Sequence, residues 1–395
     1  MAVDLSVDLA GIPLRNPVLT AAGPTSRDGE TLVKAARGGV GGLVAKTISI
    51  KPADVPRPNM QAVDRGKSQW LLATTMQNQV VHLERIQVRG AYGLLNHELW
   101  SDKPYQKWLD HEYSLAKETG LSLIASVGYT PEELQKLAPL VEKAGVDGIE
   151  FSTHYIETDP KVFNEVAKTL KEAVEVPVFA KMSPHVKDLT VFTKAVDRYV
   201  DGFVAINTLG PCLHIDIETG QPLLGGPGGV GWLSGPAIKP LAIRAVADIA
   251  RGTSKPVIGV GGVSTGADAI EFFMVGASAV QVCTAAILEG QAVYGRIANE
   301  IKVYLQNHGH DSPLDVRGVA LQHLPPETLR VESLPPTVDK KRCSGCGLCN
   351  KSCTYSAIAV NPETKIAEVD KKLCYGCGLC VSICPHYALS FQSNS

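Results

Sequence analysis

The sequence has almost no net charge and no long hydrophobic run. Its 38 lysines and arginines against 40 acidic residues leave a formal charge of −2, so nothing favours a nucleic acid or an anionic membrane as a partner. No apolar run approaches the roughly 20 residues that a membrane-spanning helix needs. The opening residues MAVDLSVDLAG lack the basic start and apolar core of a secretion signal. We therefore expect a cytoplasmic protein that makes no membrane contact.

Cysteine is scarce over most of the chain and concentrated near one end. Eight of the 10 cysteines lie between Cys343 and Cys384, which leaves Cys212 and Cys283 elsewhere. This distribution is typical of a reducing compartment and not of a secreted disulfide scaffold. No Gly-x-Gly-x-x-Gly fingerprint opens a βαβ unit either, so we expect no nicotinamide site on this chain.

The cysteine-rich end holds two matching runs, CSGCGLCNKSC from Cys343 and CYGCGLCVSICP from Cys374. Each has four cysteines at C-x2-C-x2-C-x3-C spacing, the ligand pattern of paired [4Fe–4S] clusters in which the fourth cysteine of each run binds the other cluster. Zinc knuckles and disulfides are the alternatives, but zinc prefers two C-x-x-C pairs. We predict one cluster on Cys343, Cys346, Cys349 and Cys384, and a second on Cys353, Cys374, Cys377 and Cys380.

Short apolar runs alternate with amphipathic stretches up to about residue 306. Runs rich in Val, Ile and Ala are typical of strands buried on both faces, and their alternation with helices favours a (β/α)8 TIM barrel over an open doubly wound sheet. The polar region 52–104 breaks the alternation and is expected to loop over one end of the barrel. We predict three parts: a barrel at 1–306, a proline-rich, extended linker at 307–337, and a ferredoxin-like domain with two [4Fe–4S] clusters at 338–395.

Polar and glycine residues follow the expected strands, where the active sites of such barrels lie. They include two lysines, Lys46 and Lys181. The alternative for Lys181 is a solvated lysine at a strand end with no role in a site. The Gly261-Gly262 turn and the helix expected to start at Thr284 predict a pocket of backbone N–H groups for a phosphate.

Nine segments between residues 16 and 285 carry a resemblance to a known family. They read NPVLTAAGP, GGLVAKTIS, LLNHELWSD, GVDGIE, VFAKMSP, VAINT, GGVGWLSGPAIKPLAIRAV, GVGG and GASAVQVCTA. In this order they resemble the FMN-containing dihydroorotate and dihydropyrimidine dehydrogenases. With the cysteine runs, the chain is most similar to the FMN and iron–sulfur subunits of bacterial NAD-dependent dihydropyrimidine dehydrogenases. The resemblance also supports eight strands, whereas periodicity alone supports six.

The resemblance, together with the strand ends, implies a set of site residues around FMN. Lys181 matches a lysine that lies beside the flavin ring and favours its reduced, anionic form, and Cys283 is expected to contribute its backbone. The expected cofactor-binding residues are Ala22, Gly23, Lys46, Thr47, Lys181, Asn207, Gly235, Gly261, Gly262, Cys283 and Thr284. The expected substrate-binding residues are Asn96, Ser152, Asn207 and Thr208.

The segment after the fourth strand departs from the family. Members that act on pyrimidines have an Asn-x-Ser-Cys-Pro run there, whose asparagine binds substrate and whose cysteine is the general acid or base. Here Ser152 stands at the asparagine and Tyr155 at the cysteine. A phenol with a reference pKa of ~10 is protonated at neutral pH and can donate a proton, as can an imidazole. We predict Tyr155, or His154, as the catalytic proton donor beside Lys181; the alternative is that both residues pack the shortened loop.

These features together predict a flavin and iron–sulfur oxidoreductase subunit acting on the CH–CH group of a small unsaturated substrate, dihydropyrimidine-dehydrogenase-like. Two alternatives remain: a true uracil or thymine reductase subunit, and a non-catalytic electron-transfer flavin subunit. Electrons would come from an NAD(P)H-oxidising FAD subunit or a ferredoxin. The resemblance implies a homodimer or hetero-oligomer.

Overall fold

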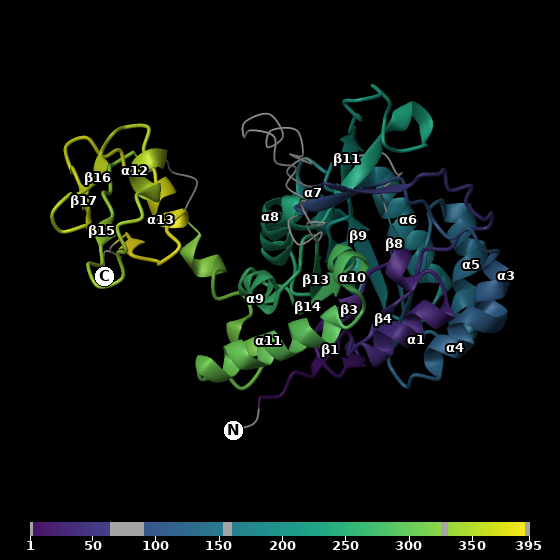
Figure 1. The fold of residues 1–395 in the computed structure, drawn as a ribbon. Helices are drawn as coiled ribbons and strands as arrows, with labels where there is room; N and C mark the ends of the chain where they lie inside the picture. Colours follow the sequence, from purple (N-terminus) through teal and green to yellow (C-terminus); the bar gives the residue numbers. More distant parts are fainter. Residues whose placement is uncertain (1–2, 64–90, 153–159, 325–330, 392–395) are drawn as a thin grey trace. The chain divides into compact units, whose positions relative to one another are not determined.

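The computed structural model describes residues 3–63, 91–152, 160–324 and 331–391 (Figure 1). The chain divides into two compact units, Met1–Leu324 and Pro325–Ser395. The division falls within the segment 307–337 that we expected to be a linker.

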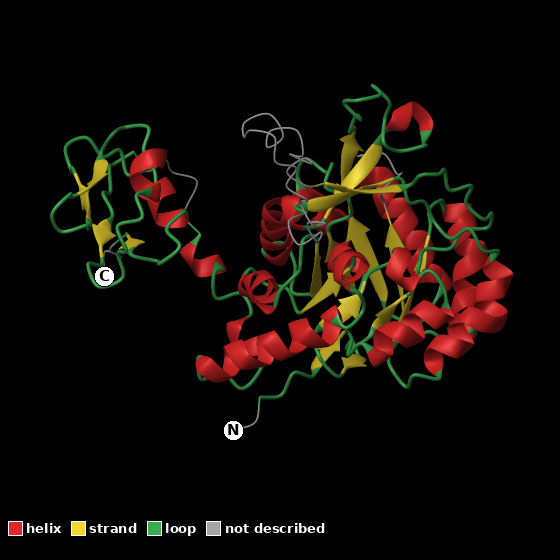
Figure 2. Ribbon diagram, in the orientation of Figure 1, coloured by secondary structure: helices red, strands yellow, loops and turns green. Residues whose placement is uncertain are grey.

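The first unit is built around eight parallel strands in the order β3-β14-β13-β10-β9-β8-β7-β4. Figure 2 shows these strands on the inside of the unit and helices outside them. A parallel bridge between Leu19 and Gly42 links the two ends of this order, so the sheet curls into a barrel and the expected (β/α)8 fold is confirmed. The strands are β3 (Val18–Thr20), β4 (Leu43–Val44), β7 (Leu123–Val127), β8 (Gly148–Ser152), β9 (Val178–Met182), β10 (Gly202–Ala205), β13 (Val257–Val260) and β14 (Ala279–Val282).

Helices surround the barrel strands. They are α1 (Gly29–Arg37), α5 (Pro131–Lys143), α6 (Pro160–Ala173), α7 (Leu189–Val196), α8 (Lys239–Ala250), α9 (Gly266–Met274), α10 (Thr284–Glu289) and α11 (Val293–Asn307). Before β7 the chain forms α3 (Tyr105–Lys107), a π-helical turn η2 (Trp108–Glu112) and α4 (Tyr113–Lys117). Short 3-10 turns complete the unit: η1 (Pro24–Ser26), η3 (Asp197–Tyr199), η4 (Pro227–Gly229), η5 (Pro236–Ile238), η6 (Pro313–Val316) and η7 (Leu321–His323). Within the described ranges, no helix is long and apolar enough to cross a membrane.

The barrel interior is closed at one end by a hairpin of β1 (Val7–Leu9) and β2 (Ile12–Leu14). Leu9 and Ile12 pack in one cluster with inward residues such as Phe179 and Val204. A side chain on Gly148, the first residue of β8, would lie 2.7 Å from Ile12 Cδ1, so the hairpin fills the amino end of the strands. The opposite, carboxyl end is left for a site.

A four-stranded antiparallel sheet stands beside the carboxyl end of the barrel, in the order β11-β12-β6-β5. It comprises β5 (Met60–Val63), β6 (Gly93–Asn96), β11 (Leu209–Cys212) and β12 (Gly231–Ser234). Two of these strands fall in the region 52–104, which we expected to be irregular. They were missed because β6 pairs with β12, far along the chain, through contacts such as Asn96 with Trp232.

The first half of the expected linker belongs to the barrel unit and is not extended. Gly318 N donates to Phe273 O over 2.9 Å and Ala320 N donates to Met274 O over 2.9 Å. Val316 is 1% exposed. These contacts dock η6 and η7 on the end of α9, because a buried valine and paired backbone groups favour packing over a solvated strap.

The second unit is small and nearly symmetric in its parts. Its elements are β15 (Thr337–Val338), α12 (Leu348–Ser352), β16 (Ile358–Val360), β17 (Ala367–Val369), α13 (Leu379–Ser382) and β18 (Leu389–Ser390). β15 pairs with β18, and β16 pairs with β17. Each cysteine run thus contributes a short helix, and the core between them contains Cys349, Ile358, Ala367 and Leu389.

Candidate active site and cluster hollows

A pocket of about 1040 Å³, open mouth included, lies at the carboxyl ends of the barrel strands. We call it the mouth pocket. It is lined by every expected cofactor- or substrate-binding residue: Ala22, Gly23, Lys46, Thr47, Asn96, Ser152, Lys181, Asn207, Thr208, Gly235, Gly261, Gly262, Cys283 and Thr284. The expected proton donors His154 and Tyr155 lie outside the described residues.

One wall of the mouth pocket carries an ion pair. Lys46 Nζ lies 2.6 Å from Glu98 Oε2, and Asn59 Nδ2 donates to the other carboxylate oxygen. Asn96 is tied to backbone: its Nδ2 donates to Trp232 O over 2.8 Å and its Oδ1 accepts from Glu98 N over 3.2 Å. Sequence reasoning missed Glu98, although it lies two residues after Asn96 in the LLNHELWSD segment.

A second polar pair joins the ends of two strands. Asn207 Nδ2 donates to Ser152 Oγ over 3.1 Å, and Asn207 Oδ1 accepts from Thr208 N over 2.8 Å. Ser152 is 5% exposed. The serine that departs from the family pattern therefore helps to fix the Asn207 amide in the wall.

Glycine turns and hydroxyl groups form the rim opposite. Gly235 has φ +88° and Gly262 has φ +85°, where other residues are strained. A side chain on Gly262 would also lie 2.7 Å from Lys239 Cβ. Thr284 Oγ1 donates to Ser234 Oγ over 2.8 Å, which brings the start of α10 against β12.

Asp268 holds the loop that follows Gly262. Its Oδ2 accepts from Ser264 N over 3.0 Å and from Thr265 N over 2.8 Å, and its Oδ1 accepts from Lys239 Nζ over 2.8 Å. Burial by itself would raise the pKa of Asp268, but these hydrogen bonds and the Lys239 charge outweigh it and hold the pKa below its ordinary value. The glycine turn is thus fixed from behind by a charged group.

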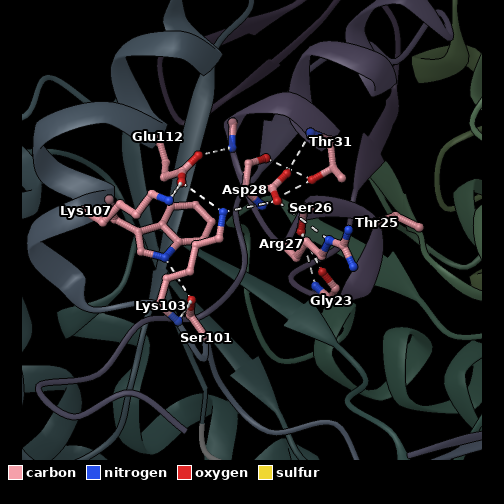
Figure 3. Close-up of polar contacts among 12 residues, drawn as sticks. Gly23, Thr25, Ser26, Arg27, Asp28, Thr31, Ser101, Lys103, Lys107 and Glu112 are labelled. Carbon is pink, nitrogen blue, oxygen red and sulfur yellow. Dashed lines mark hydrogen bonds and ion pairs between the residues drawn. The ribbon is translucent and has the colours of Figure 1, made fainter. Parts of the chain in front are cut away.

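A second charged group fixes the loop that carries Ala22 and Gly23 (Figure 3). Lys103 Nζ bridges Asp28 Oδ2 at 3.2 Å and Glu112 Oε1 at 3.0 Å. Glu112 Oε2 accepts from Gly29 N at the start of α1 over 2.7 Å. Ser26 Oγ donates to Ala21 O over 2.7 Å. This network joins the loop after β3 to the π-helical turn.

Cys283 lies in the pocket wall, close to Gly23. A side chain on Gly23 would lie 2.8 Å from Cys283 Sγ. Burial raises the pKa of the Cys283 thiol, although the positive charges of Lys46 and Lys181 act in the opposite direction. The thiol is therefore mostly neutral near pH 7 and a weak nucleophile.

The buried floor contains two residues that sequence reasoning missed, Glu150 and Gln281, each 1% exposed. Glu150 lies in the GVDGIE segment and Gln281 in GASAVQVCTA. A charged or amide side chain within a run predicted to be buried on both faces needs a partner. That requirement is the signal that could have identified both.

The donor set of the mouth pocket fits FMN. Lys46 and Lys181 supply positive charge, Thr284 and Ser234 supply hydroxyl groups, and the glycine turns bring backbone close to the space. Pockets in which a few convergent polar groups fix the orientation of the ligand are usual for cofactors.

The second unit contains two hollows, each walled by four cysteines. The first hollow is lined by Cys343, Cys346, Cys349 and Cys384. The second hollow is lined by Cys353, Cys374, Cys377 and Cys380. These are the two predicted ligand sets, each with one cysteine from the opposite run.

The cysteines of the hollows are free thiols in an environment that suits a cluster. Ala357 N donates to Cys353 Sγ over 3.3 Å and Ala388 N donates to Cys384 Sγ over 3.3 Å. Burial and, to a smaller extent, the neighbouring thiols raise the pKa of Cys349, so bound metal would be needed to hold that side chain as a thiolate.

Among the described residues, no group of three or more His, Cys, Asp or Glu side chains could hold a metal ion. A [4Fe–4S] cluster requires a different arrangement, since its four cysteines bind different irons and their sulfurs stand apart around it. The two hollows fit that larger group.

Comparisons with known proteins agree with both parts of the chain. The model of the dihydroorotate dehydrogenase family matches residues 152–305, and that of the 4Fe-4S dicluster domain matches residues 336–390. The dihydroorotate dehydrogenase B (NAD(+)) catalytic subunit of Thermoplasma volcanium is 33% identical over 329 residues, which cover 81% of this chain and 99% of that protein. The subunit of the same name from Pyrococcus horikoshii is 34% identical over 329 residues, covering 80% and 98%.

Proposed function

The chain belongs to the dihydroorotate dehydrogenase family and carries a 4Fe-4S dicluster domain, and from this premise we propose that it is the FMN- and cluster-bearing subunit of an oxidoreductase acting on the CH–CH group of a small unsaturated substrate. The observation that carries the proposal is the mouth pocket, which gathers the residues expected to hold FMN and substrate from nine separate stretches of the chain.

The roles of the side chains follow from their charge and position. FMN bound here would supply electron-pair exchange with the substrate and single-electron exchange with the clusters. Lys46 and Lys181 would balance its negative charge, and the Gly262 turn with Thr284 would hold its phosphate. Asn207 and Thr208 orient the substrate, and Ser152 in turn holds the Asn207 amide. Asn96 also lines the mouth pocket, but its amide is hydrogen-bonded to backbone groups. We propose that it orients the substrate by exchanging those hydrogen bonds for hydrogen bonds to the substrate.

We propose that a proton is given to the substrate by the Tyr155 hydroxyl, with the His154 imidazole as the alternative. The support is the sequence position, where the family has its acid-base cysteine, and the chemistry of a phenol protonated at neutral pH. Tyr155→Phe should lower kcat by at least about 100-fold, the usual contribution of general acid catalysis, with normal FMN content. Unchanged turnover in Tyr155→Phe and a comparable loss in His154→Gln would assign the proton to His154.

We propose that the substrate resembles those of the dihydropyrimidine dehydrogenases. The LLNHELWSD and SGPAIKPLAIRAV segments support that branch. Ser152 in place of the family asparagine supports a conjugated substrate other than uracil. A true uracil or thymine reductase subunit is the second candidate, favoured by the amides of Asn96 and Asn207 in one pocket. The relatives are named for dihydroorotate, so orotate belongs to the same comparison.

Electrons are proposed to reach FMN through two [4Fe–4S] clusters in the first and second hollows. The partner is an NAD(P)H-oxidising FAD subunit or a ferredoxin. The term "catalytic subunit" in the names of the relatives supports a separate electron-transferring subunit. We also propose a homodimer or hetero-oligomer, with 338–395 as the domain that meets the partner.

The test begins with protein purified without air, together with any subunit that accompanies it. We expect bound FMN and about eight irons per chain. The flavin is then reduced with dithionite and mixed with uracil, thymine, orotate, enones and acrylates. At least one compound should reoxidise the flavin faster than buffer. Protein without FMN contradicts the proposal, and a flavin that no compound reoxidises favours the non-catalytic electron-transfer subunit instead. Perturbation of the flavin spectrum by uracil would favour the second candidate.

A further inference from the structure

Three side chains close a ring at the floor of the mouth pocket. Lys181 Nζ donates to Glu150 Oε1 over 3.2 Å and to Gln281 Oε1 over 3.2 Å. Gln281 Nε2 donates to Glu150 Oε2 over 2.6 Å. Each of the three residues is therefore bonded to both others.

The ring spans the barrel. Glu150 lies on β8, Lys181 on the adjacent β9, and Gln281 on β14, which stands opposite β8 in the strand order. All three are enclosed: Glu150 and Gln281 are 1% exposed and Lys181 is 6% exposed. Because so little water reaches the ring, its members depend on one another for hydrogen bonds.

The bonding pattern of the ring is fixed by chemistry. A carboxylate only accepts and an ammonium only donates, so the amide between them must turn its NH2 to Glu150 and its oxygen to Lys181. No other orientation of Gln281 satisfies both neighbours. The position of the Glu150 carboxylate therefore fixes the Gln281 amide, and the amide in turn fixes Lys181 Nζ.

Lys181 and Gln281 line the mouth pocket, whereas Glu150 lies behind them. A buried ammonium without a counter-charge is costly, and breaking a buried pair by removing one partner is strongly destabilising. Glu150 is the carboxylate that forms an ion pair with Lys181. Any effect of Glu150 on a group in the pocket therefore passes through Lys181 and Gln281 or through its charge.

We propose that Glu150 and Gln281 are positioning residues that hold the Lys181 ammonium at one place in the floor of the mouth pocket and set the net charge that bound FMN would meet there. The inference rests on the proposed function, since it requires FMN in the mouth pocket. It predicts that the carboxylate and the amide can exchange positions 150 and 281 without changing the flavin, provided that the ring keeps one of each.

The test uses two single variants and their combination. Glu150→Gln leaves two amides and an ammonium, which cannot satisfy all three contacts. Gln281→Glu leaves two carboxylates facing each other. The double variant Glu150→Gln/Gln281→Glu restores every contact with the roles exchanged and keeps the net charge. A matched control is Glu142→Gln, which changes a half-buried glutamate whose Oε1 accepts from Glu175 N and Val176 N, away from the mouth pocket.

The main measurement is the ratio of reduced to oxidised FMN at equilibrium with a reference dye, in protein purified with its clusters and any partner. Glu150→Gln should raise the ratio about tenfold and Gln281→Glu should lower it about tenfold, as expected for one unit of charge near the flavin at an effective dielectric constant of about 20. The double variant should return to within about twofold of the wild type, and Glu142→Gln should stay there. Melting temperature, measured in parallel, should fall in each single variant and recover in the double variant.

A ratio in Glu150→Gln within about twofold of wild type overturns the inference, as does a double variant whose melting temperature falls by the sum of the two single losses instead of recovering. If a single variant does not fold, the double variant decides alone, because it must fold with wild-type FMN content and ratio. Wild-type protein without FMN would instead contradict the proposed function before any variant is compared.

Discussion

Lys46 and Glu98, 52 residues apart in the chain, meet with Nζ and Oε2 2.6 Å apart in the wall of the mouth pocket. The side chains are only 6% and 17% exposed, so the pair is shielded from water and salt. Such a contact differs from a surface ion pair, which contributes little. Removing the charge of Glu98 should therefore have a measurable effect on stability.

We expect Glu98→Gln to lower the free energy of unfolding by about 2 kcal/mol, within the range for a hydrogen bond to a charged group, and to weaken FMN retention. The reason is that Lys46 loses its counter-charge while the Asn59 contact survives in part. Thermal unfolding and flavin content after dialysis measure both effects. Glu289→Gln is the control, since Glu289 pairs with Arg296 at 50% exposure and should cost less than about 1 kcal/mol. Equal losses in the two variants would contradict the prediction.

The network in Figure 3 gives a second prediction. Glu112→Gln should lower the free energy of unfolding by about 1–3 kcal/mol. The two oxygens of the buried carboxylate accept from Gly29 N and Lys103 Nζ. A glutamine has one acceptor oxygen and no charge, so it can replace only one of these contacts. Lys107→Ala is the control: Lys107 Nζ is 3.8 Å from the same carboxylate but 53% exposed. Chemical denaturation compares the two, and a larger loss for Lys107→Ala would refute the assignment of the stabilising role to the buried contacts.

The Asp268 carboxylate gives a pH-dependent prediction. Its pKa in the folded protein lies below the ordinary 3.8, so its stabilising contribution is present above that value and is lost as pH falls through the lower, folded value. Asp268→Asn should therefore be less stable than wild type at pH 6, and the difference should shrink as the pH falls from 4 toward 3. Melting temperatures of both proteins across this range provide the check. A difference that stays constant to pH 3 would show that the charge is not responsible.

The crossed ligand sets give a prediction for the clusters. Cys353→Ser should abolish the cluster of the second hollow, although Cys353 belongs to the first run, and reduce iron from about eight to about four per chain. Its electron paramagnetic resonance spectrum should match that of Cys377→Ser. The spectrum of Cys384→Ser should match that of Cys346→Ser. A Cys353→Ser spectrum that instead matches Cys346→Ser would mean that the ligands do not cross.

Strand positions could be predicted from sequence where burial leaves a strong pattern. β8 (Gly148–Ser152) and β9 (Val178–Met182) coincide with apolar runs of the sequence, because strands covered on both faces are nearly continuous apolar runs. The cysteine runs were equally informative, since the spacing of the ligands is a property of the sequence alone. Residues that line the mouth pocket followed from the family resemblance together with the rule that barrel sites lie at strand ends.

Pairings between distant residues could not be predicted in this way. β5 and β6 are short, polar in part, and held by β12 across more than 130 residues. Glu98, Glu150 and Gln281 became recognisable only when folding brought their partners beside them. A single sequence contains the unpaired polar residue but not the identity of the residue that satisfies it. The proton donors after β8 remain predictions of the sequence.

Each hollow of the second unit takes one of its four walls from the opposite cysteine run. The first hollow is lined by Cys343 but is completed only by Cys384, from the second run. A cluster placed there would therefore find all four of its ligands only after both runs have been made. Neither run alone would hold a cluster, because each supplies only three of the four cysteines of a hollow.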